Sequence, residues 1–202
     1  MTKTAKQQKQ NLRNGFTLVE LIVALALFAT VALISAGALL SVADANRKAQ
    51  VLKSVMNNLN FALESMSREI RVGSNYYCND VVEGTVPPGF ASRRNCVNGG
   101  NFLAFEASDG NSDTPNDQII YRLNNGRIEK SINGGSSFSG LTAPEVSIDD
   151  GTGLRFYVTG APEGDSAQPK VLIILSGQAG TKDRVVTRFD IQTTVSQRSR
   201  DN

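Results

Sequence analysis

Few residues of this 202-residue chain have side chains of the kind that catalysis requires. The chain has no His and only two Cys, which excludes Ser-His-Asp and Cys-His nucleophiles, His-ligated zinc and haem bound through a proximal His. Gly151-Thr152-Gly153 lacks the third glycine of a dinucleotide loop, and the sequence has no P-loop. No two carboxylates are spaced as a recognisable glycosidase pair. We therefore expect neither enzyme activity nor a cofactor.

One acidic turn has the spacing of metal ligands. Asp109, Asn111 and Asp113 match positions 1, 3 and 5 of a calcium loop. Position 6 is Thr114 instead of Gly and position 12 is Ile120 instead of Glu, so the segment is not an EF-hand. Two interpretations stay open, a solvated acidic turn, which we favour, and an irregular calcium site.

The two cysteines are the next candidates for chemistry. Cys78 and Cys96 are separated by 17 residues that include Pro87-Pro88-Gly89 and show no regular pattern. A redox or metal-binding pair is disfavoured because the chain offers no other soft ligand. We predict a structural disulfide, which would stabilise the fold by about 3 kcal/mol on the chain-entropy model.

A single carboxylate interrupts a long apolar segment near the N-terminus. Residues 16–42 are apolar or small except for Glu20. As a helix they would extend about 40 Å, enough to cross a hydrocarbon core of roughly 30 Å. The preceding residues carry four positive charges and no acid: Lys3, Lys6, Lys9 and Arg13. This pattern predicts a membrane helix with its N-terminus in the cytoplasm and the later residues, including both cysteines, in an oxidising compartment.

Two common kinds of segment explain this region incompletely. A secretory signal could be cleaved near Ala36-Gly37-Ala38, but its apolar core needs only about 7–15 residues. A plain membrane anchor has the right length, yet neither interpretation accounts for a carboxylate five residues into the apolar run, where charge is costly.

The stretch Gly15-Phe16-Thr17-Leu18-Val19-Glu20 after a basic leader resembles the class III signal of type IV prepilins and type II secretion pseudopilins. The resemblance implies cleavage between Gly15 and Phe16 by prepilin peptidase, N-methylation of Phe16 and assembly through the helix. Its implied partners are prepilin peptidase, other pilin or pseudopilin subunits and an inner-membrane assembly platform.

Cleavage there would change the charge of the chain. Removing four positive charges takes the balance from +2 to −2, so the sequence predicts no nucleic-acid partner. A carboxylate in lipid needs a counter-charge, and the Phe16 amine of a neighbouring subunit could supply one to Glu20. The alternative is that Glu20 only reaches the lipid headgroups.

The helix should continue beyond the membrane. Apolar residues recur every three or four positions on one face: Ala45, Ala49, Leu52, Val55, Leu59, Ala62/Leu63, Met66 and Ile70. We predict one helix from about Thr17 to Val72, stopped by Gly73-Ser74-Asn75, with this stripe packed into a core.

The pattern of the remaining chain predicts short strands between polar turns. Asn125-Gly126 predicts a type I′ hairpin over residues 118–132. That turn would pair Leu123 with Ile128, Ile119 with Ile132 and Arg122 with Glu129. Further strands are expected near 102–107, 154–159, 170–176 and 184–195, with Val171–Leu175 central because it is apolar on both faces.

The predicted fold is therefore α+β, with a long N-terminal helix and a head of antiparallel sheet. Its expected divisions are a leader at 1–15, a membrane helix at 16–42, an extracytoplasmic helical part at 43–73 and a head at 74–202. Met66–Ile70, the Asn124–Glu129 hairpin and Thr193–Val195 loosely resemble larger minor pilins and the J-type minor pseudopilin. We expect a minor pilin; the alternatives are a minor pseudopilin and a membrane-anchored binding module.

Overall fold

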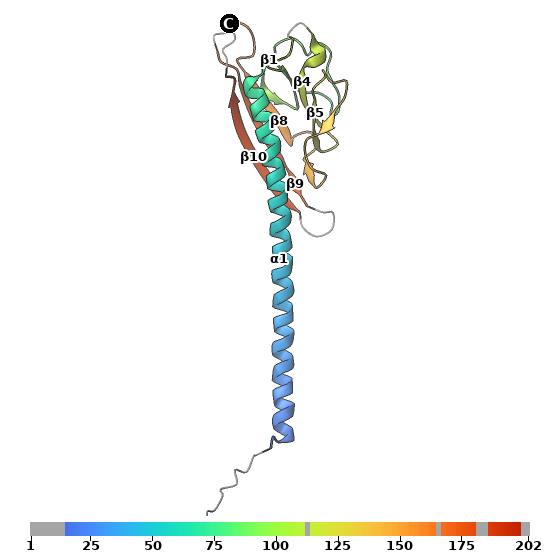
Figure 1. The fold of residues 1–202 in the computed structure, drawn as a ribbon, viewed down its shortest axis with the longest axis vertical. Coiled ribbons are helices and arrows are strands. Elements are labelled where there is room, and N and C mark those ends of the chain that lie inside the picture. The colour runs from blue at the N-terminus through green and yellow to red at the C-terminus, as the bar shows by residue number, and fades with distance from the viewer. Residues whose placement is uncertain (1–14, 112–113, 165–166, 181–185, 199–202) are drawn as a thin grey trace, which may run out of the picture. The chain divides into compact units, whose positions relative to one another are not determined.

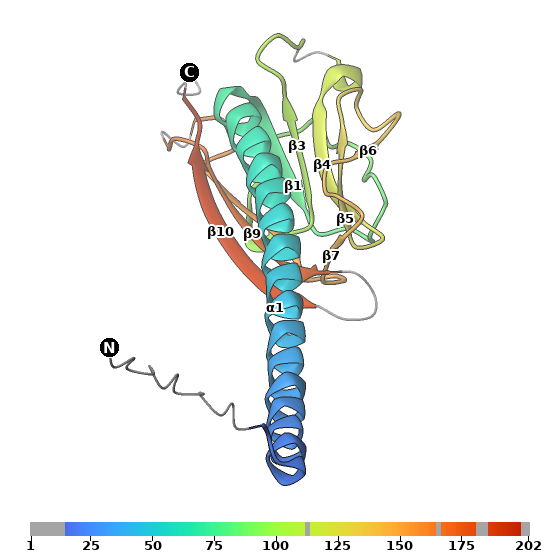
Figure 2. The same ribbon diagram turned by 60° about the horizontal axis from the view of Figure 1, so that its bottom comes forward.

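The computed structural model describes residues 15–111, 114–164, 167–180 and 186–198, which form two compact units divided between Arg47 and Lys48. One helix, α1 (Leu18–Val72), contributes to both units, as predicted. It continues through Gly37, where an added Cβ would meet no neighbouring atom. Within the second unit, α1 lies beside an antiparallel β-structure (Figures 1 and 2). The architecture is the predicted α+β one.

The strands form two sheets where the sequence predicted only a sheet-rich head. The first sheet has the order β1-β3-β4-β5-β6. Its strands are β1 (Ser74–Asn79), β3 (Phe102–Glu106), β4 (Ile119–Asn124), β5 (Arg127–Ser131) and β6 (Ser139–Gly140). A 3-10 turn at Pro115–Asp117 precedes β4.

The second sheet has the order β10-β9-β8-β2, and β7 pairs with the C-terminal end of β9. Its strands are β2 (Cys96–Gly100), β7 (Val146–Ile148), β8 (Leu154–Thr159), β9 (Lys170–Ala179) and β10 (Thr187–Ser196). Every ladder in both sheets is antiparallel.

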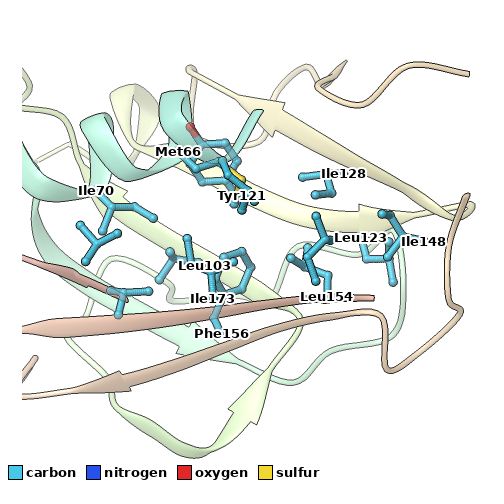
Figure 3. Close-up of a cluster of buried hydrophobic side chains, with 14 of the residues drawn as sticks. Met66, Ile70, Leu103, Tyr121, Leu123, Ile128, Ile148, Leu154, Phe156 and Ile173 are labelled. Carbon is cyan, nitrogen blue, oxygen red and sulfur yellow. The ribbon is translucent and has the colours of Figure 1, made fainter. Parts of the chain in front are cut away.

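The main core lies where α1 meets the facing sides of the two sheets (Figure 3). The helix buries one stripe: Val55, Leu59, Ala62, Leu63, Met66 and Ile70. Ala45, Ala49 and Leu52, which the sequence assigned to the same stripe, are exposed. The stripe therefore becomes core only from Val55 onward, since a helix face is buried only along the length that the sheets cover.

The C-terminal end of α1 is tied to the head by hydrogen bonds. The Gly73 N–H donates to the Glu69 carbonyl, and the Tyr76 hydroxyl lies 2.5 Å from the Ile70 carbonyl and 2.8 Å from that of Gly73. The Arg198 N–H donates to the Arg71 carbonyl. These donors satisfy carbonyls that the end of a helix leaves without partners, so α1 ends where the sequence placed its stop.

The Asn125-Gly126 hairpin has the predicted turn. Both residues have positive φ, 49° and 68°, and Leu123 faces Ile128 while Arg122 faces Glu129. The expected pairing of Ile119 with Ile132 is absent because β5 ends at Ser131. There the Ser131 hydroxyl accepts the Asn133 and Gly135 N–H groups, which turns the chain away and leaves Ile132 exposed.

Strand β9 is central, as predicted, but it is not fully buried on both faces. Val171, Ile173 and Leu175 are buried, whereas Leu172 and Ile174 on the opposite face are half-buried. The second sheet thus turns one side to the core and leaves the other partly open, as is common for antiparallel sheets.

Candidate functional site

The candidate cleavage position lies just before α1. Residues 15–17 are non-helical, and an added Cβ on Gly15 would meet no atom within 4 Å. The fold described for this chain therefore gives no steric reason for a glycine here. A need for glycine would have to come from a molecule that approaches the backbone, which a residue without a side chain leaves open. The charged leader residues Lys3, Lys6, Lys9 and Arg13 lie outside the described residues.

Thr17 fixes the start of the helix. Its hydroxyl accepts the Glu20 N–H at 3.3 Å, and its carbonyl accepts the Leu21 N–H at 3.2 Å. This is half of a capping box, whose signature is Thr followed three residues later by Glu. Among the described residues, none donates a hydrogen bond to the Glu20 carboxylate or forms an ion pair with it. Its negative charge therefore lies in the first turn without a counter-charge from this part of the chain.

Apart from Glu20, the first part of α1 presents a surface of apolar and small side chains. Its most apolar 18-residue window has a mean hydropathy of 2.5, and none of that window is buried by the described residues. The Thr30 hydroxyl donates to the Leu27 carbonyl, so this polar side chain is satisfied within the helix. A continuous apolar surface of this length indicates a lipid or helix-packed environment, and it is consistent with single-pass membrane anchoring.

The predicted disulfide is present. Cys78 and Cys96 are bonded with their Cα atoms 5.5 Å apart. Cys78 belongs to edge strand β1 of the first sheet, and Cys96 to edge strand β2 of the second. The bond therefore joins the two sheets, in addition to closing a loop. Residues of that loop, including Val81, Val86 and Phe90, pack on Phe102 and Ile120 at the outer face of the first sheet.

The acidic turn is only partly described. Asp109 and Asn111 lie in the connection between β3 and β4, while Asp113 is outside the described residues. The Asp117 carboxylate accepts the Asn111 N–H at 2.8 Å and the Thr114 hydroxyl at 3.2 Å. In the described part of the chain, no three or more His, Cys, Asp or Glu residues are grouped to hold a metal ion. The calcium interpretation of Asp109, Asn111 and Asp113 stays a prediction.

Sequence reasoning missed an ionic contact between α1 and the first sheet. The Glu69 carboxylate accepts the Tyr121 hydroxyl at 2.7 Å and the Lys130 ammonium at 2.6 Å. Burial and the adjacent Glu69 carboxylate raise the pKa of Tyr121, which keeps its hydroxyl protonated as a donor. Because these partners are 52 and 61 residues from Glu69, no local pattern in the sequence signals the contact.

A second missed feature is a buried carboxyl group. Glu106, the last residue of β3, is 3% exposed, and neither of its carboxylate oxygens has a hydrogen-bond partner of normal geometry. The side-chain oxygen of buried Gln118 is likewise without one. Burial raises the pKa of Glu106, the charge of Asp117 raises it further, and the Gln118 amide opposes the rise.

Comparison with known proteins gave one match. Residues 10–36 match the family described as the prokaryotic N-terminal methylation motif. No curated protein and no solved structure matched the chain. The matched segment includes Gly15, Phe16 and Glu20 and the start of α1. Such a motif suggests a structural, non-enzymatic subunit that is recognised by prepilin peptidase and assembles with other pilin subunits. With its N-terminal methylation motif and the long apolar helix that follows, the chain fits the type IV pilin and pseudopilin family.

Proposed function

We propose that the chain is a minor structural subunit of a type IV pilus-like filament. Prepilin peptidase cuts between Gly15 and Phe16, Phe16 is N-methylated, and the mature subunit assembles through its N-terminal helix. The observation that carries the proposal is the methylation motif at residues 10–36, directly continued by a helix whose apolar surface the described residues leave uncovered. Helices of neighbouring subunits would cover that surface in a filament.

In this proposal Glu20 is the assembly residue. Its carboxylate has no partner among the described residues, and Thr17 caps the helix without using it. A new amine at Phe16 of a neighbouring subunit would supply the counter-charge that a carboxylate in a low-dielectric setting needs. The charge pair would thus fix the register of one subunit against the next.

We also propose the topology and the division of the chain. The leader is 1–15, the membrane helix 16–42, the extracytoplasmic helical part 43–73 and the head 74–202. The leader charges would hold the N-terminus in the cytoplasm, and the Cys78–Cys96 disulfide suits a head in an oxidising compartment. The assembly platform of the inner membrane would take up the anchored subunit.

A minor pseudopilin of a type II secretion system is the second candidate. Met66–Ile70 and the Asn124–Glu129 hairpin resemble the J-type minor pseudopilin as well as the larger minor pilins, so this candidate stands beside the first. Met66–Ile70 contains Glu69, whose carboxylate binds Lys130, the residue that directly follows the hairpin segment in β5. Two depletions would distinguish the candidates. If the chain is a pilus subunit, depletion of pilus genes should abolish its cross-linking to neighbouring subunits. If it is a pseudopilin, depletion of secretion genes should do so instead.

Processing is tested by intact mass. In cells with active prepilin peptidase, the wild-type chain should lose residues 1–15 and carry one added methyl group on Phe16. Gly15→Val should block cleavage because a β-branched side chain crowds the backbone beside the scissile bond. Gly37→Val is the matched control, since an added Cβ there also meets no neighbouring atom. An uncut wild-type chain, or a mature end near Ala38, would contradict the proposal.

The assembly role is tested by cysteine cross-linking between neighbouring subunits in cells. Glu20→Ala should leave insertion and processing intact but lower incorporation into the filament. Thr30→Val is the control, because it removes another polar group of the same helix without removing charge. Unchanged cross-linking of Glu20→Ala at equal membrane abundance would show that Glu20 only faces the headgroups.

A further inference from the structure

Strand β10 ends the second sheet on one side and leaves a long edge open. It pairs with β9 over all ten of its residues, Thr187–Ser196, without a shift in register. Among the described residues, no strand pairs with the other side of β10, and no backbone hydrogen bond reaches these ten residues except from β9. Figure 2 shows β10 at the border of the head. We call this open side the β10 edge.

The backbone groups that point to the β10 edge can be identified. In an antiparallel ladder, alternate residues bond to the neighbouring strand and the others point away from it. Gln197, which directly follows β10, donates its N–H to the carbonyl of Pro169, which directly precedes β9. On β9, Ser176 lies opposite Asp190 but uses its N–H and its carbonyl on the far side, toward the connection between β7 and β8. Both observations assign outward-pointing N–H and C=O groups to the same residues: Arg188, Asp190, Gln192, Thr194 and Ser196.

Within the described part of the head, the three other sheet edges are protected in ways that the β10 edge is not. Strand β1 is bulged and exchanges two hydrogen bonds with Arg94. Strand β2 has a shift in register, and its Gly100 lies against the backbone of Asn79. Strand β6 has only two residues. In contrast, β10 is long and has no bulge, no Pro and no Lys, which makes it a template for pairing with another chain.

The side chains of β10 indicate what kind of strand fits beside it. On the core side, Phe189 and Val195 are buried, whereas Ile191 and Thr193 between them are only half-buried. On the opposite side, every side chain is exposed and polar: Arg188, Asp190, Gln192, Thr194 and Ser196. A fitting strand therefore alternates, with apolar side chains toward the core and polar ones outward. An acid opposite Arg188 and a base opposite Asp190 would form favourable cross-strand pairs.

A second copy of this chain does not fit through the same edge. Within the head, β10 runs in the same direction as α1, and the two end together where the Arg198 N–H donates to the Arg71 carbonyl (Figures 1 and 2). Two β10 edges paired antiparallel would point their α1 helices in opposite directions. Two subunits anchored alike in one membrane, as proposed above, cannot pair in that way. Two β10 edges paired in parallel would bring opposite faces of the two sheets to the same side, so apolar side chains of one would lie beside polar side chains of the other.

We propose that the β10 edge binds an extended segment of a different protein, which adds to the second sheet as an antiparallel strand. Its backbone would bond to the outward groups between Arg188 and Ser196 and supply the affinity, while its alternating side chains would supply the specificity. The antiparallel direction agrees with every ladder of both sheets and is the slightly more stable one. The site goes beyond the proposed function, because binding at the head edge needs neither processing nor the packing of membrane helices.

The test uses the full-length chain in detergent and a synthetic peptide, Thr-Val-Thr-Val-Thr-Val-Lys-Val-Glu. Paired antiparallel with residues 188–196, this peptide places its Glu opposite Arg188 and its Lys opposite Asp190. At saturating peptide, amide hydrogen exchange measured by NMR should slow at least about tenfold at Asp190, Gln192 and Thr194. The amides of the residues between them, which already bond to β9, should change much less. No slowing, or equal slowing at all residues of β10, would overturn the proposal.

A proline variant with a matched control tests the backbone contact. Thr194→Pro removes one outward N–H and leaves the bonds to β9 in place, because edge strands tolerate Pro where the N–H faces away from the sheet. It should abolish the protection by the peptide, whereas Thr194→Ala keeps the N–H and should bind the peptide like the wild type. Equal protection in Thr194→Pro and the wild type would show that the peptide does not add as a strand, and the proposal would fail.

A charge variant protects the test against a folding defect of the proline variant. Arg188→Glu should weaken binding of the peptide about two- to fivefold, and a peptide ending in Lys instead of Glu should restore it. Binding that does not depend on these charges would contradict the proposed register. The oligomeric state without peptide tests the choice of partner. A dimer of the wild type that Thr194→Pro abolishes would show that a second copy occupies the edge, and it would overturn the proposal of a different protein.

Discussion

Helix α1 has two parts that obey the same backbone geometry but are stabilised by different surroundings. Up to Arg47, every described residue of the helix is exposed, and the large apolar side chains from Leu18 to Val42 face outward. From Val55 to Ile70, the apolar side chains of one stripe are buried against the chain's own sheets. The change of surroundings occurs without a break in the helix.

The composition of each part matches its surroundings. Apart from Glu20, residues 16–42 are apolar or small on all sides, which is the pattern of a helix enclosed by lipid or by other helices. Residues 48–72 are amphipathic, with Glu64 and Arg68 paired on the exposed face. The comparison shows that helix propensity alone says little about what stabilises a segment. The distribution of apolar residues around the helix indicates what it must pack against.

The largest effect that separates the two parts is expected from truncating a leucine in each. Leu59→Ala should lower the free energy of unfolding of the head by about 2–5 kcal/mol, because Leu59 is fully buried and its truncation leaves a cavity. Leu25→Ala should leave head unfolding unchanged, because Leu25 is 64% exposed. Urea unfolding of the full-length chain in detergent, followed by the near-ultraviolet circular dichroism of its tyrosines, measures both.

One outcome of this experiment would contradict the comparison between the two parts of α1. Equal loss of head stability in Leu25→Ala would mean that the exposed apolar part of the helix and the head unfold as one cooperative unit. The division at Arg47 and Lys48 would then have no energetic meaning.

Sequence reasoning succeeded where the information was local. The helix length followed from three- and four-residue spacing and from Gly73, and the hairpin followed from Asn125-Gly126. The exact ends of strands were harder to predict. The Ile119–Ile132 pairing was wrong because hydrogen bonds from Asn133 and Gly135 to the Ser131 hydroxyl, which no periodicity reveals, end β5 one residue earlier.

Contacts distant in sequence could not be predicted. The Cys78–Cys96 pairing was expected, yet that it joins the edges of two separate sheets depends on the strand order. The burial of Glu106 depends on the loop that covers it. From the sequence alone, an acidic residue at the end of a strand is predicted to be exposed. Gly15, Phe16 and Glu20 were found because their motif is contiguous, while their roles in processing and assembly stay predictions.

A smaller effect separates two ionic contacts that α1 makes in its second part among the described residues. Glu69 binds Tyr121 and Lys130 with its side chain only 25% exposed, whereas Glu64 pairs with Arg68 four residues along with its side chain 73% exposed. Glu69→Gln should cost about 1–2 kcal/mol of head stability, because a partly buried ammonium and a buried hydroxyl lose a charged acceptor. Glu64→Gln makes the same change and should cost at most about 0.5 kcal/mol. The loss in Glu69→Gln should also persist at high salt, since a partly buried pair is screened less than an exposed one. Equal losses in the two variants, measured by urea unfolding at low and high salt, would show that the Glu69 contact contributes no more than a surface ion pair and that apolar packing alone holds α1 on the sheets.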